Sequence, residues 1–166
     1  LEYADMCEDK EAVTKYTAVT RFFRAFFYFE KVKRFGDVPW YDIQLGSADE
    51  LLYKPRDSRE LILTKMLEDI DYAINSGGLT ESAADPYHVN KWAALALKAQ
   101  FCLYEGTYRK YHNLNLDGHD ANFYLDLAAK AALEIIEKGP YKLYQTGHPE
   151  KDYLTLFAQK DASPEE

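Results

Sequence analysis

Apolar residues recur every three to four positions along several long stretches of the chain, the spacing of α-helices that bury one face. The first such stretch runs from about Asp9 to Phe35. Gly36 follows at a position that suits the left-handed end of a helix, and Pro39 comes where a helix cannot continue. We therefore predict a long first helix that ends at Gly36.

The first predicted helix carries an unusual density of aromatic residues. Six of the eight residues from Phe22 to Phe29 are aromatic, and they spread around most of the helix circumference. A helix that is apolar nearly all round is typically buried between neighbours. We expect a core helix here rather than a one-sided ligand-binding surface, and its interspersed arginines and lysines exclude a membrane span.

The same periodicity predicts three further helices, at about 57–75, 91–108 and 122–138. Asp57 and Glu60 have the spacing of a capping box at the start of the second helix, and Asn90 is placed to cap the third. The stretches 40–55, 79–89 and 107–121 read as loops, and a short apolar segment follows at 153–157.

Two helix pairs in succession predict an all-α fold, a tetratricopeptide-like helical-repeat solenoid. Alanine-rich helix faces favour close helix packing, although the insert at 107–121 breaks the usual repeat period. The chain ends on Ser-Pro-Glu-Glu without the closing helix that solenoids normally need. We expect residues 1–166 to form a single helical region, incomplete as a solenoid and part of a longer protein.

Composition narrows the function classes. The 166 residues carry a formal charge of -8 with a pI near 5.0, so a phosphate backbone would be repelled and nucleic acid is not an expected partner. No apolar run approaches the roughly 18 residues of a membrane span. Of the two cysteines, Cys102 lies in an apolar helical pattern and is expected to be a buried thiol.

Catalytic and metal-binding patterns are weak. Glu68, Asp69 and Asp71 lie close together on a predicted helix, where we expect them to face solvent rather than act as a catalytic pair. The insert "HNLNLDGHD" resembles the start of a calcium loop, but Tyr124 stands where the bidentate Glu is required. A partial calcium site at Asp117 and Asp120 remains the alternative to a polar surface loop. We expect no enzyme, no metal and no cofactor.

Aromatic residues in predicted loops are the candidates for sugar binding. An exposed ring can stack on the apolar face of a sugar, while nearby amides and carboxylates bond its hydroxyls. The residues that qualify by location are Trp40, Tyr41, Tyr53, Tyr87 and Tyr111, with His112 and Asn113 beside the last. For each of them, the alternative is a residue packed against a neighbouring helix.

Arg24 and Asp37 are candidates for structural roles. Arg24 lies among aromatic residues, so its guanidinium should find an acceptor or stack on a ring; the alternative is that it reaches solvent. Asp37 should accept backbone amides in the turn after Gly36.

Three stretches in order resemble the SusD/RagB family of outer-membrane nutrient-binding lipoproteins. They are "RFFRAFFYFEKVKRFGDVPW", "RDSRELILTKMLEDIDYAI" and "VNKWAALALKAQFCLYEGTY", and "DYLTLF" fits the family's next segment. The family's motif includes Arg24, Phe35, Gly36, Asp37 and Pro39. Trp92 departs from the glycine that is usual in the family.

The resemblance implies a function that composition does not show. Family members bind glycans, or in some cases peptides, at the cell surface and deliver them to a SusC-type TonB-dependent outer-membrane transporter, without catalysis. The resemblance also implies a lipid anchor upstream of Leu1 as the means of membrane attachment. The alternative is a helical-repeat interaction scaffold that binds no ligand of its own.

Overall fold

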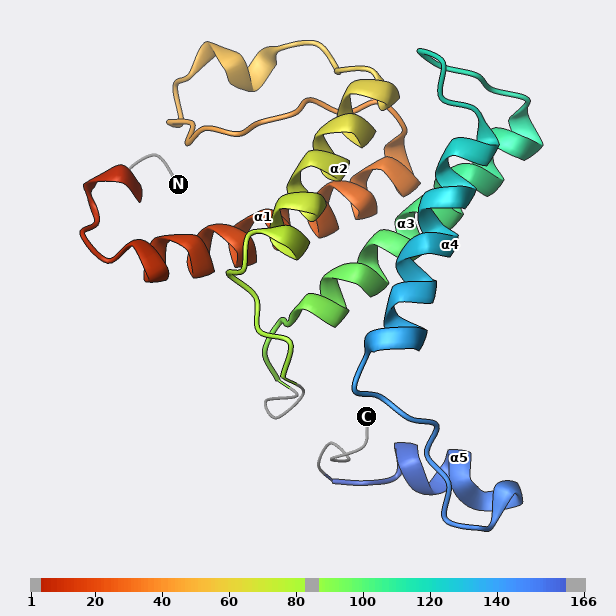
Figure 1. Cartoon of the computed structure of the whole chain (residues 1–166). Coiled ribbons are helices and arrows are strands. Elements are labelled where there is room, and N and C mark those ends of the chain that lie inside the picture. The colour runs from red at the N-terminus through yellow and green to blue at the C-terminus, as the bar shows by residue number, and fades with distance from the viewer. Residues whose placement is uncertain (1–3, 83–86, 161–166) are drawn as a thin grey trace.

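The structure is a computed structural model that describes residues 4–82 and 87–160. These residues form helices and two isolated β-bridges, which confirms the all-α fold class (Figure 1). The C-terminal segment 161–166, with the Ser-Pro-Glu-Glu ending, lies outside the described residues. The described residues contain the α-helices α1 (Lys10–Phe35), α2 (Arg59–Asn75), α3 (Lys91–His112), α4 (Ala121–Lys138) and α5 (Pro149–Phe157), with short 3-10 helices η1 (Ala4–Met6) and η2 (Glu50–Tyr53).

The helices are arranged as two successive hairpins. α1 packs on α2, α3 packs on α4, and contacts between α2 and α3 join the two pairs (Figure 1). This is the tetratricopeptide-like arrangement that the sequence predicts. α5 lies away from the hairpins beyond the end of α4 (Figure 1). No helix in the described parts of the chain has the length and apolar character to cross a bilayer.

Side-chain caps fix where most of the helices begin. Asp9 accepts a hydrogen bond from Ala12 N at 2.9 Å, and Asn90 accepts one from Ala93 N at 2.8 Å. The predicted capping box of α2 is wrong by one residue, because the cap is Ser58. Asp57 and Glu60 do not form it, since both carboxylates are taken up by residues from other parts of the chain.

The predicted burial of α1 on nearly all sides is wrong for the described residues. One face is buried, formed by Ala18, Ala25, Tyr28, Phe29 and Val32. Phe22 is partly buried against the core, whereas Phe23, Phe26, Phe27 and Phe35 are largely exposed. Helical spacing groups the apolar positions into rows on the helix surface. It does not show which of these rows a neighbouring helix covers.

Buried charges join the two hairpins. Arg59 binds both carboxylate oxygens of Glu105, with Nε 2.9 Å from Oε2 and 3.1 Å from Oε1. Arg109 donates from Nε to Glu105 Oε1 at 2.8 Å and also binds Glu60. The four side chains carry two positive and two negative charges, and each is a tenth exposed or less. We call these four residues the buried charge network.

Residues from α4 and from the segment before it also contact this network. Arg109 donates to the backbone carbonyl of His119, and His119 Nδ1 lies 2.6 Å from Glu60 Oε1. The Arg109 guanidinium also lies 4.5 Å from the ring centre of Tyr124. Burial lowers the pKa of Arg109, but its bonds to Glu60 and Glu105 outweigh burial and raise that pKa overall. The network therefore ties the start of α2 to the end of α3 and to the segment that leads into α4.

Arg24 meets the expectation that it finds an acceptor and a ring. It binds Asp69 in a two-pronged ion pair, with distances of 2.6 and 2.7 Å, and its guanidinium lies 5.0 Å from the ring centre of Trp40. The ion pair is the main reason why the pKa of Arg24 is raised. The expectation that Asp69 faces solvent is wrong, because this carboxylate is 2% exposed and joins α2 to α1.

A glycine sets the closest approach of α3 and α4. A Cβ on Gly106 would lie 2.7 Å from Leu125 Cγ and 3.1 Å from the carbonyl oxygen of Ala121. Both distances are tighter than ordinary packing, so only glycine fits this crossing. The thiol of Cys102, one turn earlier on α3, is buried as predicted, and burial raises its pKa to about 12.

We predict that Gly106→Ala destabilises the protein by about 1–2 kcal/mol. Overpacking at the crossing costs roughly 1–3 kcal/mol, and the better helix propensity of alanine returns up to about 1 kcal/mol. Denaturant unfolding measures the difference. Gly46→Ala is the control, because a Cβ there has no atom within 4 Å. Equal stability of the two variants would contradict the close crossing.

Candidate functional site

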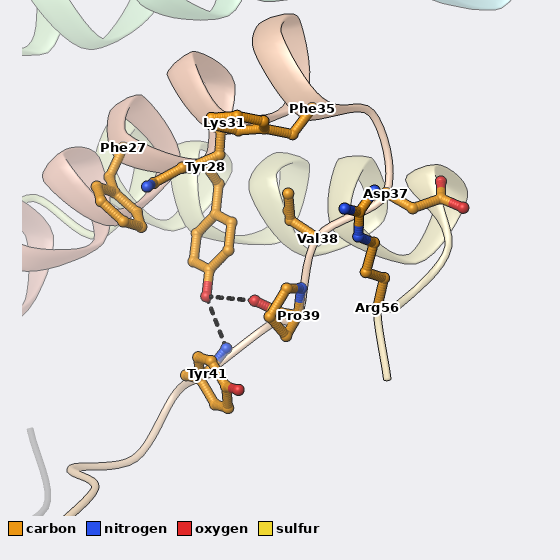
Figure 2. A pocket seen from close by; sticks show the side chains of 9 residues that line it. All are labelled: Phe27, Tyr28, Lys31, Phe35, Asp37, Val38, Pro39, Tyr41 and Arg56. Carbon is orange, nitrogen blue, oxygen red and sulfur yellow. Dashed lines mark hydrogen bonds between the residues drawn. The ribbon is translucent and has the colours of Figure 1, made fainter. Parts of the chain in front are cut away.

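A groove of about 330 Å³ lies between the end of α1 and the segment that follows it. Its size is at the lower end of the range of small-molecule sites. Figure 2 shows the side chains that line it. They are Phe27, Tyr28, Lys31, Phe35, Asp37, Val38, Pro39, Tyr41 and Arg56.

One wall of the groove is a row along α1. Phe27, Lys31 and Phe35 are four residues apart, so they lie one above another on one helix face. The Lys31 ammonium lies 5.1 Å from the ring centre of Phe27 and 5.7 Å from that of Phe35. These are cation–π distances, and they place a positive charge between two exposed rings.

The opposite wall is held in place by the hydroxyl of Tyr28. This hydroxyl accepts a hydrogen bond from Tyr41 N at 2.7 Å and donates to Pro39 O at 3.2 Å, as the dashed lines in Figure 2 show. Tyr41 in turn donates from its own hydroxyl to Leu51 O at 2.8 Å. Burial raises the pKa of Tyr28. Helix α1 thus fixes the segment that turns back along it.

Asp57 fixes the same segment from the side of α2. Its Oδ2 accepts from Trp40 N at 2.6 Å and from Lys54 Nζ at 2.7 Å, and its own N–H bonds Val38 O at 3.2 Å. The bond from Lys54, followed by the bond from Trp40, lowers the pKa of Asp57. Lys54 also donates to Trp40 O at 2.6 Å.

Asp37 plays a different role from the one predicted. Its Oδ1 accepts from the N–H of Arg59 at 2.9 Å, so it caps the start of α2 rather than the turn after Gly36. The local sequence favoured the nearer amides, but the chain folds back and brings the first turn of α2 within reach. Arg56, which precedes that turn, also lines the groove.

The groove places aromatic and charged side chains side by side. Aromatic rings supply flat apolar area, and the charged side chains Lys31, Asp37 and Arg56 supply polar contacts beside it. Among the residues that the structure describes, no three His, Cys, Asp or Glu side chains are grouped to hold a metal ion. Such a surface suits a ligand with both apolar faces and polar groups.

Two of the predicted sugar-binding residues lie at this groove or behind it. Tyr41 is half-buried and lines it. Trp40 follows the packing alternative: it is 7% exposed, and its ring stacks on Tyr28 with centroids 4.2 Å apart. Trp40 therefore supports the groove from the core.

The other predicted residues are distributed over separate surfaces. Tyr53 is exposed at the end of η2, and Tyr87 is exposed before α3. Tyr111 and His112 belong to the last turn of α3, which runs further than predicted, and Asn113 caps it in the left-handed conformation. The loops before and after α3 lie at opposite ends of that helix (Figure 1). The structure thus brings Tyr41, and none of the others, to the groove.

The sequence does not single out Phe27, Lys31 or Arg56 as groove residues. The pattern places Phe27 on a core helix, Lys31 counts there only among the charges that exclude a membrane span, and Arg56 carries no signal of its own. The available signal was the spacing of Phe27, Lys31 and Phe35, because a lysine between two rings on one helix face marks an exposed face.

Comparison with known proteins identifies the fold. No protein-family model matches the chain. A SusD-like protein from Bacteroides fragilis, solved by crystallography, superposes on 86% of the chain with 29% sequence identity and a TM-score of 0.63. The chain has a SusD-like fold. This confirms the resemblance seen in the sequence.

A second structural relative was crystallised with a xylogluco-oligosaccharide. It superposes on 86% of the present chain at 23% identity and a TM-score of 0.59, so it shows the shared fold. The chain spans about a quarter of the length of these structures, 24% of the first and 27% of the second.

A shorter stretch of the chain is similar to an enzyme. A phenylalanine dehydrogenase from Bacillus thermotolerans is 37% identical over 73 residues, which is 44% of the chain and 19% of that relative. Dehydrogenases that use a nicotinamide cofactor hold it on a parallel βαβ sheet. The described residues of this chain form helices and isolated bridges and include no such sheet. The similarity therefore does not extend to a dinucleotide-binding fold in this part of the chain.

We predict that Asp57 stabilises the groove segment most at neutral pH. Because its folded pKa is lowered, its contribution is present above the ordinary aspartate value of about 4 and is lost as pH falls through the folded pKa. Asp57→Asn should cost about 1 kcal/mol at pH 7, and the difference from wild type should shrink below about pH 4.

Unfolding titrations at several pH values test this. Asp126→Asn changes an exposed carboxylate on α4 and serves as control. A difference between wild type and Asp57→Asn that stays constant down to low pH would contradict the role of the charge.

Proposed function

We propose that this SusD-like chain belongs to a non-catalytic protein that binds glycans at the cell surface and delivers them to a SusC-type TonB-dependent transporter. The observation that carries the proposal is the match to a SusD-like protein over 86% of the chain. A relative of the same fold, crystallised with a xylogluco-oligosaccharide, supports a glycan as the ligand.

The groove beside α1 supports a binding role in this chain itself. Sugars present apolar C–H faces and hydroxyls, and the groove pairs exposed rings with charged groups. Its segment is fixed by Tyr28 and Asp57, so little ordering is needed when a ligand binds. We assign Tyr41 and Phe27 as the ring surfaces that contact sugar.

We further propose that residues 1–166 are one helical region of a longer protein. The chain covers only 24–27% of the two structures described, and other parts of such a protein would contribute to ligand binding. Attachment to the outer membrane through an upstream lipid anchor belongs to the same proposal. The exposed candidates outside the groove, Tyr53, Tyr87 and Tyr111 with His112 and Asn113, would face those parts or the ligand.

The second candidate function is an interaction scaffold for the transporter. It is favoured by apolar side chains that stay exposed on α4 and α5, including Ile136, Tyr153 and Phe157. A scaffold without ligand binding would retain the transporter in a pull-down and bind no glycan.

We predict that Phe27→Ala weakens glycan binding by about tenfold in the full-length protein. Removal of a ring that stacks on the ligand costs roughly 1–1.5 kcal/mol, close to the factor of ten. Calorimetry with a panel that includes xylogluco-oligosaccharide measures the affinity.

Phe23→Ala is the matched control. Phe23 lies one turn earlier on α1, is 51% exposed against 52% for Phe27, and makes a similar edge contact with its neighbour, but it does not line the groove. Equal affinities of the two variants would reject the groove as the site. Absence of binding across the panel would reject glycan capture and leave the scaffold function.

A further inference from the structure

The groove carries two positively charged side chains that the binding of a neutral sugar would not require. Lys31 and Arg56 both line it, and among the described residues neither forms an ion pair with a carboxylate. Neighbouring cations are paired: Lys33 and Arg34 with Glu30, and Lys54 with Asp57. The groove thus holds two cations that are free to meet an anionic ligand, on a chain whose formal charge is -8.

The carboxylate in the lining does not cancel both cations. Asp37 is the acidic residue among the lining residues, and its Oδ1 is engaged by the N–H of Arg59 at 2.9 Å. The lining side chains carry two positive charges and one negative charge. The balance of the groove is therefore opposite in sign to that of the whole chain.

We infer that the groove binds acidic oligosaccharides, with sugar units that carry a carboxylate, such as uronates. This inference rests on the proposed glycan-binding function and names its ligand class. A uronate has an apolar ring face that can stack on Phe27 or Tyr41. Its carboxylate matches the planar fork of Arg56 and the point charge of Lys31.

The position of Lys31 favours this ligand over an uncharged one. Its ammonium lies between the rings of Phe27 and Phe35, so a sugar that stacks on either ring brings its substituents next to that charge. A carboxylate placed there gains an ion pair, whereas a neutral hydroxymethyl group gains at most a hydrogen bond. An apolar peptide segment would leave the positive charges of Lys31 and Arg56 without an anionic partner, so the groove also favours an acidic sugar over such a peptide.

The charge of the ligand should change affinity by about tenfold. Exposed ion pairs are individually weak, so two such pairs together correspond to roughly one order of magnitude in the dissociation constant. Because the cations are near the surface, salt screens the gain, and the preference for the acidic sugar should narrow at high ionic strength.

The experiment uses the full-length protein and two probes, an oligogalacturonide and a neutral galactan oligosaccharide of equal length. Calorimetry at low and high salt gives the affinities for wild type, for the double variant Lys31→Gln/Arg56→Gln, and for Lys15→Gln. Lys15 is an exposed lysine on α1 outside the groove. Wild type and Lys15→Gln should bind the acidic probe about tenfold more tightly than the neutral probe, and the double variant should lose this preference.

Several results would overturn the inference. Equal affinity of wild type for the two probes would do so, and glycan binding in the earlier panel would then leave the proposed function standing. An acidic preference that survives in the double variant would place the anion site elsewhere. Equal loss of both probes in the double variant would show that the cations support the fold of the groove rather than recognise charge. Binding of neither probe would also reject the inference.

Discussion

The buried charge network is the interaction on which the rest of the structure depends. Arg59, Glu60, Glu105 and Arg109 leave water together, and their desolvation is tolerable only because the two positive and two negative charges are fully paired. Glu60 and Arg109 are 49 residues apart in the sequence, so the pairing exists only when the two hairpins are docked. The network therefore specifies how α2 meets α3 more than it adds net stability.

The groove is connected to this network by a short series of contacts. Asp37 holds the N–H of Arg59, and the side chain of Arg59 binds Glu105. From the other side, Tyr28 holds Tyr41 and Arg24 supports the ring of Trp40. A surface whose walls are fixed in this way is preorganised, which is what a binding protein needs because less freedom is lost when the ligand arrives. The ring of Trp40 is part of the same support, since it is buried beneath this surface and stacks on Tyr28.

The sequence predicted the helices well because their signals are local. Periodicity, Asn90 as a cap and Gly36 as a stop depend on residues a few positions away, and each was confirmed. The errors arise where distant residues compete. Asp57 lost its expected role as a cap because Trp40 and Lys54 bind it, and Asp69 is buried because Arg24 reaches it from α1. The groove could be predicted only in part, since Tyr41 was recognisable as an aromatic residue in a loop, whereas the position of Arg56 depends on how the chain folds back.

A double-mutant cycle on Arg59 and Glu105 tests the central claim most directly. Arg59→Met leaves the network with one unpaired negative charge, and Glu105→Leu leaves it with one unpaired positive charge, so each should cost about 3–5 kcal/mol. The double variant retains the neutral pair of Glu60 and Arg109, and it should be less destabilised than the sum of the single variants by about 2 kcal/mol or more. Unfolding free energies that simply add would contradict the claim that charge neutrality in this network governs how the two hairpins are joined.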